Sequence, residues 1–262
     1  MTPETSRLAS ELLQLAESVA IAAGDLLMDR PSSFELSEKT TAIDFATQMD
    51  LKAETLIVQS LLAARPDDGI IGEEGAARES TSGITWVIDP LDGTVNYFYG
   101  LPGWNVSIAA RDSQGSLVGV VNAPTINSLW HAVRGAGAFH NGEKIRSTTQ
   151  VSLDRALLGT GFAYDVADRT EQIAMVASLL PRTRDIRRMG SAAVDLCHVG
   201  MGALDGYFER GLKEWDWAAG ALVATDAGAH VAHLGDGARK LTVAAGAGLF
   251  QTLQEALAGA LD

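Results

Sequence analysis

Residues 86–94 read Trp-Val-Ile-Asp-Pro-Leu-Asp-Gly-Thr, an apolar run followed by two carboxylates three residues apart. Pro90 fixes its own φ and disfavours helical geometry at Asp89, so we expect Asp89 at the end of a strand that enters a turn. Two carboxylates this close repel each other unless a cation lies between them, and Mg²⁺ suits such oxygen ligands. Gly93 and Thr94 offer backbone N–H groups where a helix could begin, which suits a phosphate. The stretch therefore predicts a site for metal and phosphate.

Asp-Pro and Asp-Gly are also common turn dipeptides, so a solvated turn is the alternative for this stretch taken alone. Other segments add acidic residues. Glu73 follows the apolar run 69–71 and should emerge from the end of a strand, with a solvated loop acid as the alternative. Asp216 lies between two tryptophans before an alanine-rich helix, where it would serve equally well as the N-cap. Asp44 and Asp50 lie where the chain approaches a helix, and capping is their default role.

The composition limits the class of protein. The chain has 262 residues, 47% hydrophobic, with 27 glycines, which suits a globular α/β or α+β protein with ample core. A net charge of −13 argues against nonspecific binding to nucleic acid or anionic membranes. The only cysteine, Cys197, excludes an internal disulfide and fits a reducing cytoplasm. We see neither a signal peptide nor an apolar run long enough to span a membrane.

The chain changes character near residue 150. Strands cluster before it and helices alternate with strands after it, which indicates two sheet layers covered by helices in an α/β (mixed α+β) fold. We expect an N-terminal subdomain over 1–150, carrying most metal ligands, and a C-terminal one over 151–262. The patterns predict helices over 4–30, 48–64, 170–180, 191–201, 217–227 and 249–261. They predict strands over 69–72, 85–88, 106–111, 117–122, 129–133, 138–140, 143–146, 157–161, 185–189, 206–209 and 242–245, with Asn141-Gly142 as a hairpin turn.

Other signals are weak. The Gly159-Thr160-Gly161 sequence lacks the third glycine of a dinucleotide fingerprint. His230 and His233 have no carboxylate or cysteine at a metal-ligand spacing. We interpret these residues as structural.

The acidic segments together resemble a known family. Residues 86–97 look like the first signature of the inositol monophosphatase family, and residues 215–228 look like the second. Gly72-Glu73-Glu74 stands where the family keeps its glutamate pair, and Lys39 and Asp50 fall at the expected distances before it. Residues 191–193 and 207–209 resemble the substrate-pocket segments. The resemblance implies a layered αβαβα sandwich.

The resemblance also implies a cofactor, Mg²⁺, with two to three ions per active site. Glu73, Asp89 and the Leu91 carbonyl would bind one ion. Asp89, Asp92 and Asp216 would bind a second, with a third, weaker ion near Glu73. Hard oxygen ligands of this kind are those that Mg²⁺ prefers.

The same resemblance assigns the catalytic and substrate-binding residues. Glu73, Thr94 and Asp50 would be catalytic, with Thr94 hydrogen-bonded to Asp50 to help orient and deprotonate the attacking water. The phosphate would meet the N–H groups of Gly93 and Thr94, and Glu209 would contact the alcohol portion. The residues implied to contact substrate are Asp92, Gly93, Thr94, Ser191, Ala192, Glu209 and Asp216.

The implied reaction is Mg²⁺-dependent hydrolysis of a small phosphate monoester by direct attack of water. We favour myo-inositol 1-phosphate, because Glu209 is a good acceptor for hydroxyl groups. Glu209 would pair equally well with the amine of histidinol phosphate, and fructose 1,6-bisphosphate and 3′-phosphoadenosine 5′-phosphate are further alternatives within the superfold. The family also implies a cytoplasmic homodimer that Li⁺ inhibits. A regulatory protein that binds RNA or protein is the rival from another class.

Overall fold

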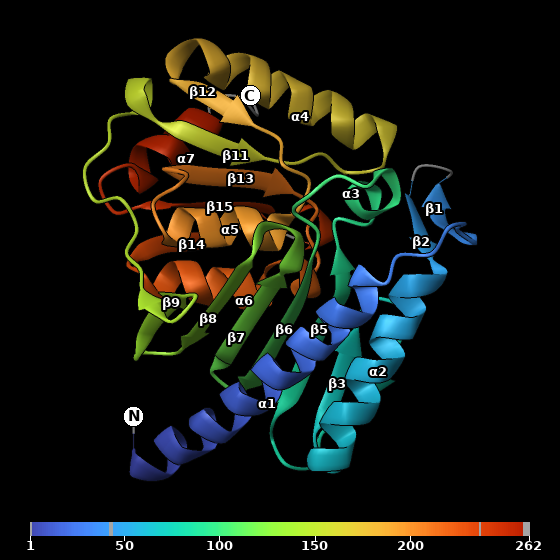
Figure 1. Cartoon of the computed structure of the whole chain (residues 1–262). Coiled ribbons are helices and arrows are strands. Elements are labelled where there is room, and N and C mark those ends of the chain that lie inside the picture. The colour runs from blue at the N-terminus through green and yellow to red at the C-terminus, as the bar shows by residue number, and fades with distance from the viewer. Residues whose placement is uncertain (1, 42–43, 236, 259–262) are drawn as a thin grey trace.

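The computed structural model describes residues 2–41, 44–235 and 237–258 and stacks them in alternating layers of helices and sheets (Figure 1). Two helices cover the outer face of an eight-stranded sheet, two lie between this sheet and a five-stranded sheet, and two cover the far face of the latter. In chain order these pairs are α1 (Pro3–Met28) with α2 (Gln48–Ala64), α5 (Ala192–Gly200) with α6 (Glu214–Asp226), and α4 (Val166–Leu179) with α7 (Phe250–Ala258). The layered αβαβα fold is confirmed.

The eight-stranded sheet has the order β10-β9-β8-β7-β6-β5-β3-β4 and is antiparallel except for the parallel pair β3 and β5. Its central strands are buried on both faces, which explains their nearly continuous apolar sequence. Asn141 and Gly142 form the predicted turn between β9 and β10. The strands are β3 (Gly69–Gly72), β4 (Ala77–Arg78), β5 (Thr85–Asp92), β6 (Asn105–Asp112), β7 (Gly115–Ala123), β8 (Ser128–Val133), β9 (Gly137–His140) and β10 (Glu143–Lys144).

The five-stranded sheet has the order β12-β11-β13-β15-β14. Strand β11 runs parallel to both of its neighbours, and the other pairs are antiparallel. Its strands are β11 (Leu157–Thr160), β12 (Asp185–Arg187), β13 (Gly206–Arg210), β14 (Ala229–Leu234) and β15 (Leu241–Gly246), and a separate pair is formed by β1 (Leu36–Thr41) and β2 (Asp44–Thr47). The 1–150 and 151–262 division stays a prediction.

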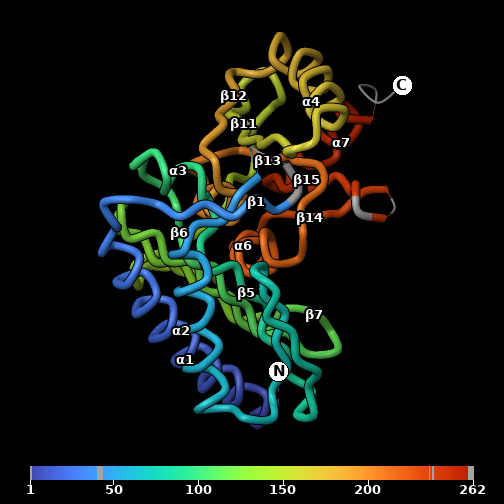
Figure 2. The backbone as a smooth tube through the Cα atoms, turned by 90° about the vertical axis from the view of Figure 1, so that its right-hand side faces the viewer, coloured from blue at the N-terminus to red at the C-terminus, as the bar shows by residue number. Residues whose placement is uncertain are grey.

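Helix α6 lies between strands of the two sheets in both views (Figures 1 and 2). Residues Ala218 to Ala224 are all buried, because a helix enclosed by two sheets has no solvent face. Two glycines permit this packing. A Cβ on Gly119 of β7 would lie 2.8 Å from the Ala219 carbonyl oxygen, and one on Gly220 would lie 2.8 Å from the Ala193 carbonyl oxygen.

Several sequence predictions need correction. Strand β5 does not end at Asp89 but continues to Asp92, with its pairing to β6 interrupted between the two. Helices α4 and α6 begin earlier than predicted, and β1, β2, β4 and β14 were not predicted as elements. The helix start predicted at Gly93-Thr94 is that of the short helix α3 (Thr94–Tyr99), whose length the sequence did not indicate. Helix α7 is described to Ala258, so its predicted last turn lies outside the described residues.

The remaining elements are short 3₁₀ turns, namely η1 (Pro124–Ile126), η2 (Leu153–Arg155), η3 (Leu180–Arg182) and η4 (Gly237–Arg239). In the part of the chain that the structure describes, none of the helices could cross a membrane by length and apolarity.

Candidate active site

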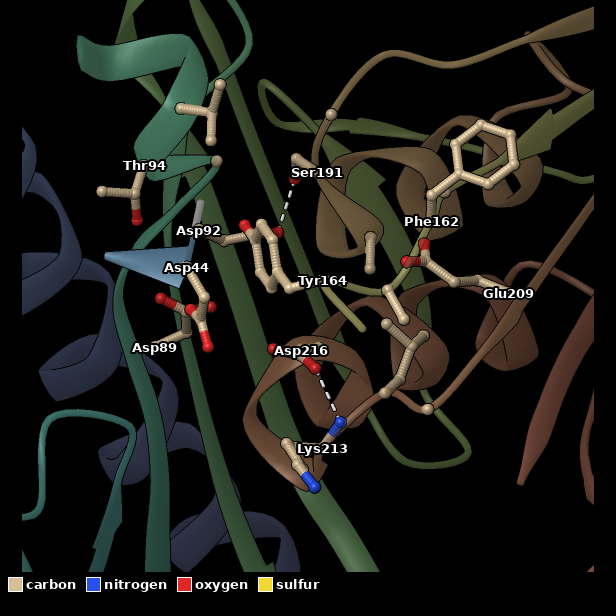
Figure 3. A pocket seen from close by; sticks show the side chains of 18 of the residues that line it. Asp44, Asp89, Asp92, Thr94, Phe162, Tyr164, Ser191, Glu209, Lys213 and Asp216 are labelled. Atoms are coloured by element: carbon tan, nitrogen blue, oxygen red, sulfur yellow. Dashed lines mark hydrogen bonds between the residues drawn. The ribbon is translucent and has the colours of Figure 1, made fainter. Parts of the chain in front are cut away.

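One cavity of about 430 Å³ brings together acidic side chains from both halves of the chain (Figure 3). Glu73 directly follows β3, and Asp89 and Asp92 lie in the last four residues of β5. Asp216 lies on the first turn of α6. All the residues that the sequence predicted to contact metal or substrate also line this cavity, with Asp50 behind it. They are Glu73, Asp89, Leu91, Asp92, Gly93, Thr94, Ser191, Ala192, Glu209 and Asp216.

The Asp92 carboxylate is held by groups from distant parts of the chain. Its Oδ2 accepts hydrogen bonds from Ser191 Oγ at 2.5 Å, from the Ala193 N–H at 3.0 Å and from Asn105 Nδ2 at 3.3 Å. Burial raises the pKa of Asp92 to about 6, although these donors oppose the rise. Three donors on one oxygen fix the carboxylate and leave Oδ1 for another partner.

Asp89 has far less support. Its side chain is 2% exposed, and the hydrogen bond that its carboxylate accepts comes from the Leu91 N–H, at 3.0 Å. Burial raises the pKa of Asp89 well above its usual range, and the negative charges of Glu73, Asp92 and Asp216 raise it further. An ionised Asp89 therefore needs a nearby positive charge.

Asp216 is not the N-cap of α6. The helix begins at Glu214, and Asp216 is its third residue, whose Oδ2 accepts the Lys213 N–H at 2.6 Å (Figure 3). The carboxylate thus satisfies an N–H at the helix start from within the first turn and still lines the cavity. Burial raises its pKa well above the usual range, followed by the charges of Glu73 and Asp92.

Thr94 and Asp50 meet at the start of α3. The Thr94 hydroxyl lies 3.1 Å from Asp50 Oδ1 and also 3.1 Å from the Leu91 carbonyl oxygen, so its one hydrogen has two alternative acceptors. Asp50 is fully buried and caps α2, since its Oδ2 accepts the N–H and hydroxyl of Thr47 at 2.7 and 2.6 Å. The capping role predicted for Asp50 and its contact with Thr94 therefore coexist. Asp44 instead begins β2 and lines the cavity.

Gly93 has a φ of +87°, which a residue with a side chain rarely adopts. A Cβ at this position would lie 3.3 Å from the Gly190 carbonyl oxygen and from Trp104 Cα. Gly93 thus lets segments from both halves of the chain approach each other at the beginning of α3. The sequence predicted a helix start at this point, and α3 begins at Thr94.

Two glutamates beside the cavity pair with a lysine. Lys39 Nζ lies 2.8 Å from Glu73 Oε1 and 2.6 Å from Glu74 Oε1. Burial lowers the pKa of Lys39, but the two glutamates outweigh it and raise the pKa overall. The loop is fixed from behind by Glu54, which accepts the N–H groups of Glu74 and Ala76 at 2.9 and 3.0 Å. Sequence reasoning missed this role of Glu54.

At the far end of the cavity, Glu209 accepts a short hydrogen bond from the buried Tyr207 hydroxyl. A Cβ on Gly161 would overlap the Glu209 carboxylate, so the bare backbone makes room for it. Burial raises the pKa of Glu209 to about 7, against the effects of Tyr207 and the Arg188 guanidinium. Tyr164 and Arg188, which line the cavity, and Asn105, which supports Asp92 and Ser191, are further residues that the sequence analysis did not identify. A polar residue at the start of an apolar strand was the available signal for Asn105.

Comparison with protein families decides the assignment. The inositol monophosphatase family model matches residues 8–262. The chain belongs to the inositol monophosphatase family. Members of this family are metal-dependent phosphatases that act on small phosphorylated substrates, generally with Mg²⁺.

The chain is similar to proteins from several bacteria. The chain is 41% identical over 231 residues to inositol-1-monophosphatase SuhB of Mycobacterium tuberculosis (strain ATCC 25618 / H37Rv), covering 84% of this chain and 80% of the relative. It is 41% identical over 222 residues to Nus factor SuhB of Escherichia coli (strain K12), covering 83% of each. The crystal structure of the suhB protein from Bartonella henselae superposes with a TM-score of 0.88 at 31% identity, over 94% of this chain and 98% of that one.

Proposed function

We propose that this phosphatase hydrolyses myo-inositol 1-phosphate to inositol and phosphate in a Mg²⁺-dependent reaction. One observation carries the proposal. Four acidic side chains from three places in the fold face one cavity beside the start of α3, namely Glu73 after β3, Asp89 and Asp92 in β5, and Asp216 in α6. Burial and the nearby negative charges raise the pKa values of the three aspartates. Such an arrangement is unfavourable for a resting protein and favourable for a site that binds cations.

The donor set fits Mg²⁺ chemically, since every candidate ligand is an oxygen atom. Among the described residues, no group of three or more His, Cys, Asp or Glu side chains has a geometry that could already hold a metal ion. The Glu73 carboxylate instead forms an ion pair with Lys39 at 2.8 Å. We propose Glu73, Asp89, the Leu91 carbonyl, Asp92 and Asp216 as the ligands of two to three ions.

Bound Mg²⁺ would supply positive charge against the phosphate and lower the pKa of a water molecule. The chain itself would orient that water. When the Thr94 hydroxyl donates to Asp50, its oxygen lone pairs remain free to accept a hydrogen bond from the water. Glu73 lines the same cavity and would accept the proton, while the N–H groups of Gly93 and Thr94 would hold the phosphate. With no cysteine or histidine nucleophile required, we propose direct attack of water.

The opposite end of the cavity would bind the alcohol portion. Glu209 is fixed there by Tyr207, and Ala192 and Ser191 lie at the start of α5. A carboxylate accepts hydrogen bonds from sugar hydroxyl groups, which supports inositol as the alcohol. It would also pair with an amine, so histidinol phosphate is the first alternative substrate.

The experiment compares kcat/KM for phosphate release from inositol 1-phosphate, histidinol phosphate, fructose 1,6-bisphosphate and 3′-phosphoadenosine 5′-phosphate, each with Mg²⁺ and with EDTA. We expect inositol 1-phosphate to be preferred and EDTA to abolish release. Preference for another compound would refute inositol as the substrate and leave the metal site in place. No release from any of them would favour a regulatory role, as the name of the E. coli relative, Nus factor SuhB, suggests for that protein.

We also propose a homodimer that Li⁺ inhibits. Exposed apolar side chains support an association surface near α3, since Tyr99, Leu101 and Met189 are 70%, 52% and 40% exposed. The single cysteine, buried in α5, supports a reducing compartment such as the cytoplasm.

A further inference from the structure

Within the described residues, the side-chain hydrogen bond that ties helix α3 to the second half of the chain comes from Asn96. This side chain is 6% exposed, and its Nδ2 donates to the Met189 carbonyl oxygen at 2.8 Å and to the Pro102 carbonyl oxygen at 3.0 Å. The first of these bonds joins residues 93 positions apart. Both hydrogens of the amide are therefore used, and one of them crosses between the halves.

Backbone contacts confirm how closely the two segments approach. Gly190 follows Met189 and has a φ of +103°. A Cβ on Gly190 would lie 2.7 Å from Asn96 Oδ1, and a Cβ on Gly93 would lie 3.3 Å from the Gly190 carbonyl oxygen. Glycine at these two positions therefore lets the segments approach closely, and a side chain at position 190 would collide with the Asn96 amide.

The segment that Asn96 holds leads directly into the groups that support Asp92. Ser191 is two residues beyond Met189. Its hydroxyl donates to Asp92 Oδ2, and it caps α5 by accepting the Val194 N–H at 3.1 Å. The Ala193 N–H donates to the same Asp92 oxygen. A shift of the segment by a fraction of an ångström would therefore reach the Asp92 carboxylate.

The other end of α3 is anchored within the first half alone. Arg30 Nε donates to the Tyr97 carbonyl oxygen at 3.0 Å, and the Tyr97 hydroxyl donates to the Leu27 carbonyl oxygen at 2.8 Å. These contacts fix α3 to the end of α1 and do not touch the segment before α5. Among the side-chain hydrogen bonds that α3 makes to the described residues, those of Asn96 alone reach that segment.

We propose that Asn96 is a positioning residue for the phosphatase reaction. Its amide locks residues 189–191 against α3, so that Asp92, supported from the second half, and the N–H groups at Gly93 and Thr94, supplied by the first half, face the substrate at a fixed separation. The inference rests on the proposed function. Asn96 contacts neither substrate nor metal in this account and acts through Met189 and Ser191.

The test uses the full-length protein with Asn96→Ala and a matched control, Asn122→Ala. Asn122 is 8% exposed, and its Nδ2 donates to the Ala20 carbonyl oxygen at 2.9 Å across 102 positions, away from the cavity. Both variants lose a buried amide bonded to a distant backbone carbonyl. Two readouts are compared, namely kcat and KM for release from inositol 1-phosphate, and the rise in melting temperature on adding Mg²⁺ with inorganic phosphate.

For Asn96→Ala we expect kcat to fall on the order of ten- to a hundredfold, with KM changed far less. The rate of the chemical step falls steeply when catalytic groups are displaced. We expect the rise in melting temperature with Mg²⁺ and phosphate to shrink. Asn122→Ala should lower the basal melting temperature but keep both kcat and that rise. Equal effects of the two variants on kcat and on the rise would overturn the proposal.

If either alanine variant does not fold, Asn96→Asp and Asn122→Asp give the same comparison with side-chain size preserved and the donated hydrogen bond removed. An inactive wild-type protein whose melting temperature still responds to Mg²⁺ and phosphate would refute the proposed function only. The second readout would then decide the role of Asn96 by itself.

Discussion

Asp89 and Asp92 lie three residues apart, yet their carboxylates have opposite surroundings. Asp92 Oδ2 accepts three hydrogen bonds, whereas Asp89 accepts one from the Leu91 N–H and otherwise meets the Glu73 carboxylate, a contact that raises its pKa. Hydrogen bonds to the charged form stabilise it, so Asp92 can stay ionised at neutral pH more easily than Asp89. The burial of Asp89 without such partners is what most clearly requires a cation.

Glu209 accepts a hydrogen bond from the Tyr207 hydroxyl, which supports its carboxylate. We predict that Tyr207→Phe raises KM for inositol 1-phosphate about tenfold, because a hydrogen bond to a charged group contributes about 1.5–3 kcal/mol. The value of kcat should change little, since Tyr207 lies far from the predicted water site at Thr94. Steady-state kinetics check this, with Tyr99→Phe, at a 70% exposed tyrosine, as the control. An unchanged KM in Tyr207→Phe would show that Glu209 needs no such support.

Individual site residues were predictable where one segment contains the whole signal. Asp89 and Asp92 were identified because their spacing and Pro90 are local features, and Glu73 because it follows an apolar run. Asn105 and Glu54 were not, because their partners lie 86 and 20 positions away, at Ser191 and Glu74. Nothing near either residue in the sequence indicates those partners.

At the scale of elements, hydrophobic patterns predicted the long helices and the central strands. The central strands are almost completely buried. The pattern failed where burial is partial. Residues 36–39 of β1 are exposed and mostly polar, and β14 has one buried residue among six. Helix α3 is too short for a helical period to be visible, since it has six residues. Strand β5 passes its proline because the pairing with β6 is interrupted there.

The contact of α5 with α6 gives a prediction at this scale. Gly220→Ala should lower the free energy of unfolding by about 1–3 kcal/mol, because the added methyl group would meet the Ala193 carbonyl oxygen at 2.8 Å and force the two helices apart. Gly200→Ala serves as a graded control at the same interface, since its methyl group would lie 3.2 Å from Ala224 Cα. Urea unfolding measures both. A larger loss in Gly200→Ala would contradict the packing described for Gly220.

For the whole molecule, which has a net charge of −13, some of the acidic groups are buried inside the fold. Asp50, Asp89, Asp195 and Asp216 all have pKa values raised by burial first of all. Each of these groups makes the ionised protein less stable than it would be with the group exposed. The buried acids around the cavity therefore lower the free energy of unfolding, as is usual for a functional site.

This arrangement sets the pH dependence without metal. Burial raises the pKa of Glu74 and of Glu209 from 4.5 to about 7, so the folded state binds more protons than the unfolded state between these values. Stability is therefore higher at low pH and is lost as pH rises through about 7. In EDTA, we predict that the melting temperature rises when pH is lowered from 8 to 6.5.

The window for that measurement ends at pH 6.5 because histidines act in the opposite direction. Burial lowers the pKa values of His140 and His198 below 6.5, so their contribution to stability is lost as pH falls further. Differential scanning calorimetry at pH 8, 7 and 6.5 would check the prediction. A melting temperature that falls steadily over this range would contradict the assignment of the buried acids.

The central claim is that the buried carboxylates around Asp89 form a site for divalent cations, and the most direct measurement is the melting temperature during a Mg²⁺ titration of the wild-type protein and of Asp89→Asn. Asparagine keeps an oxygen to accept the Leu91 N–H and removes the buried charge. We predict that Asp89→Asn melts at a higher temperature than the wild type without metal, and that Mg²⁺ raises the melting temperature of the wild type but hardly that of the variant. An equal rise in both proteins would contradict the claim.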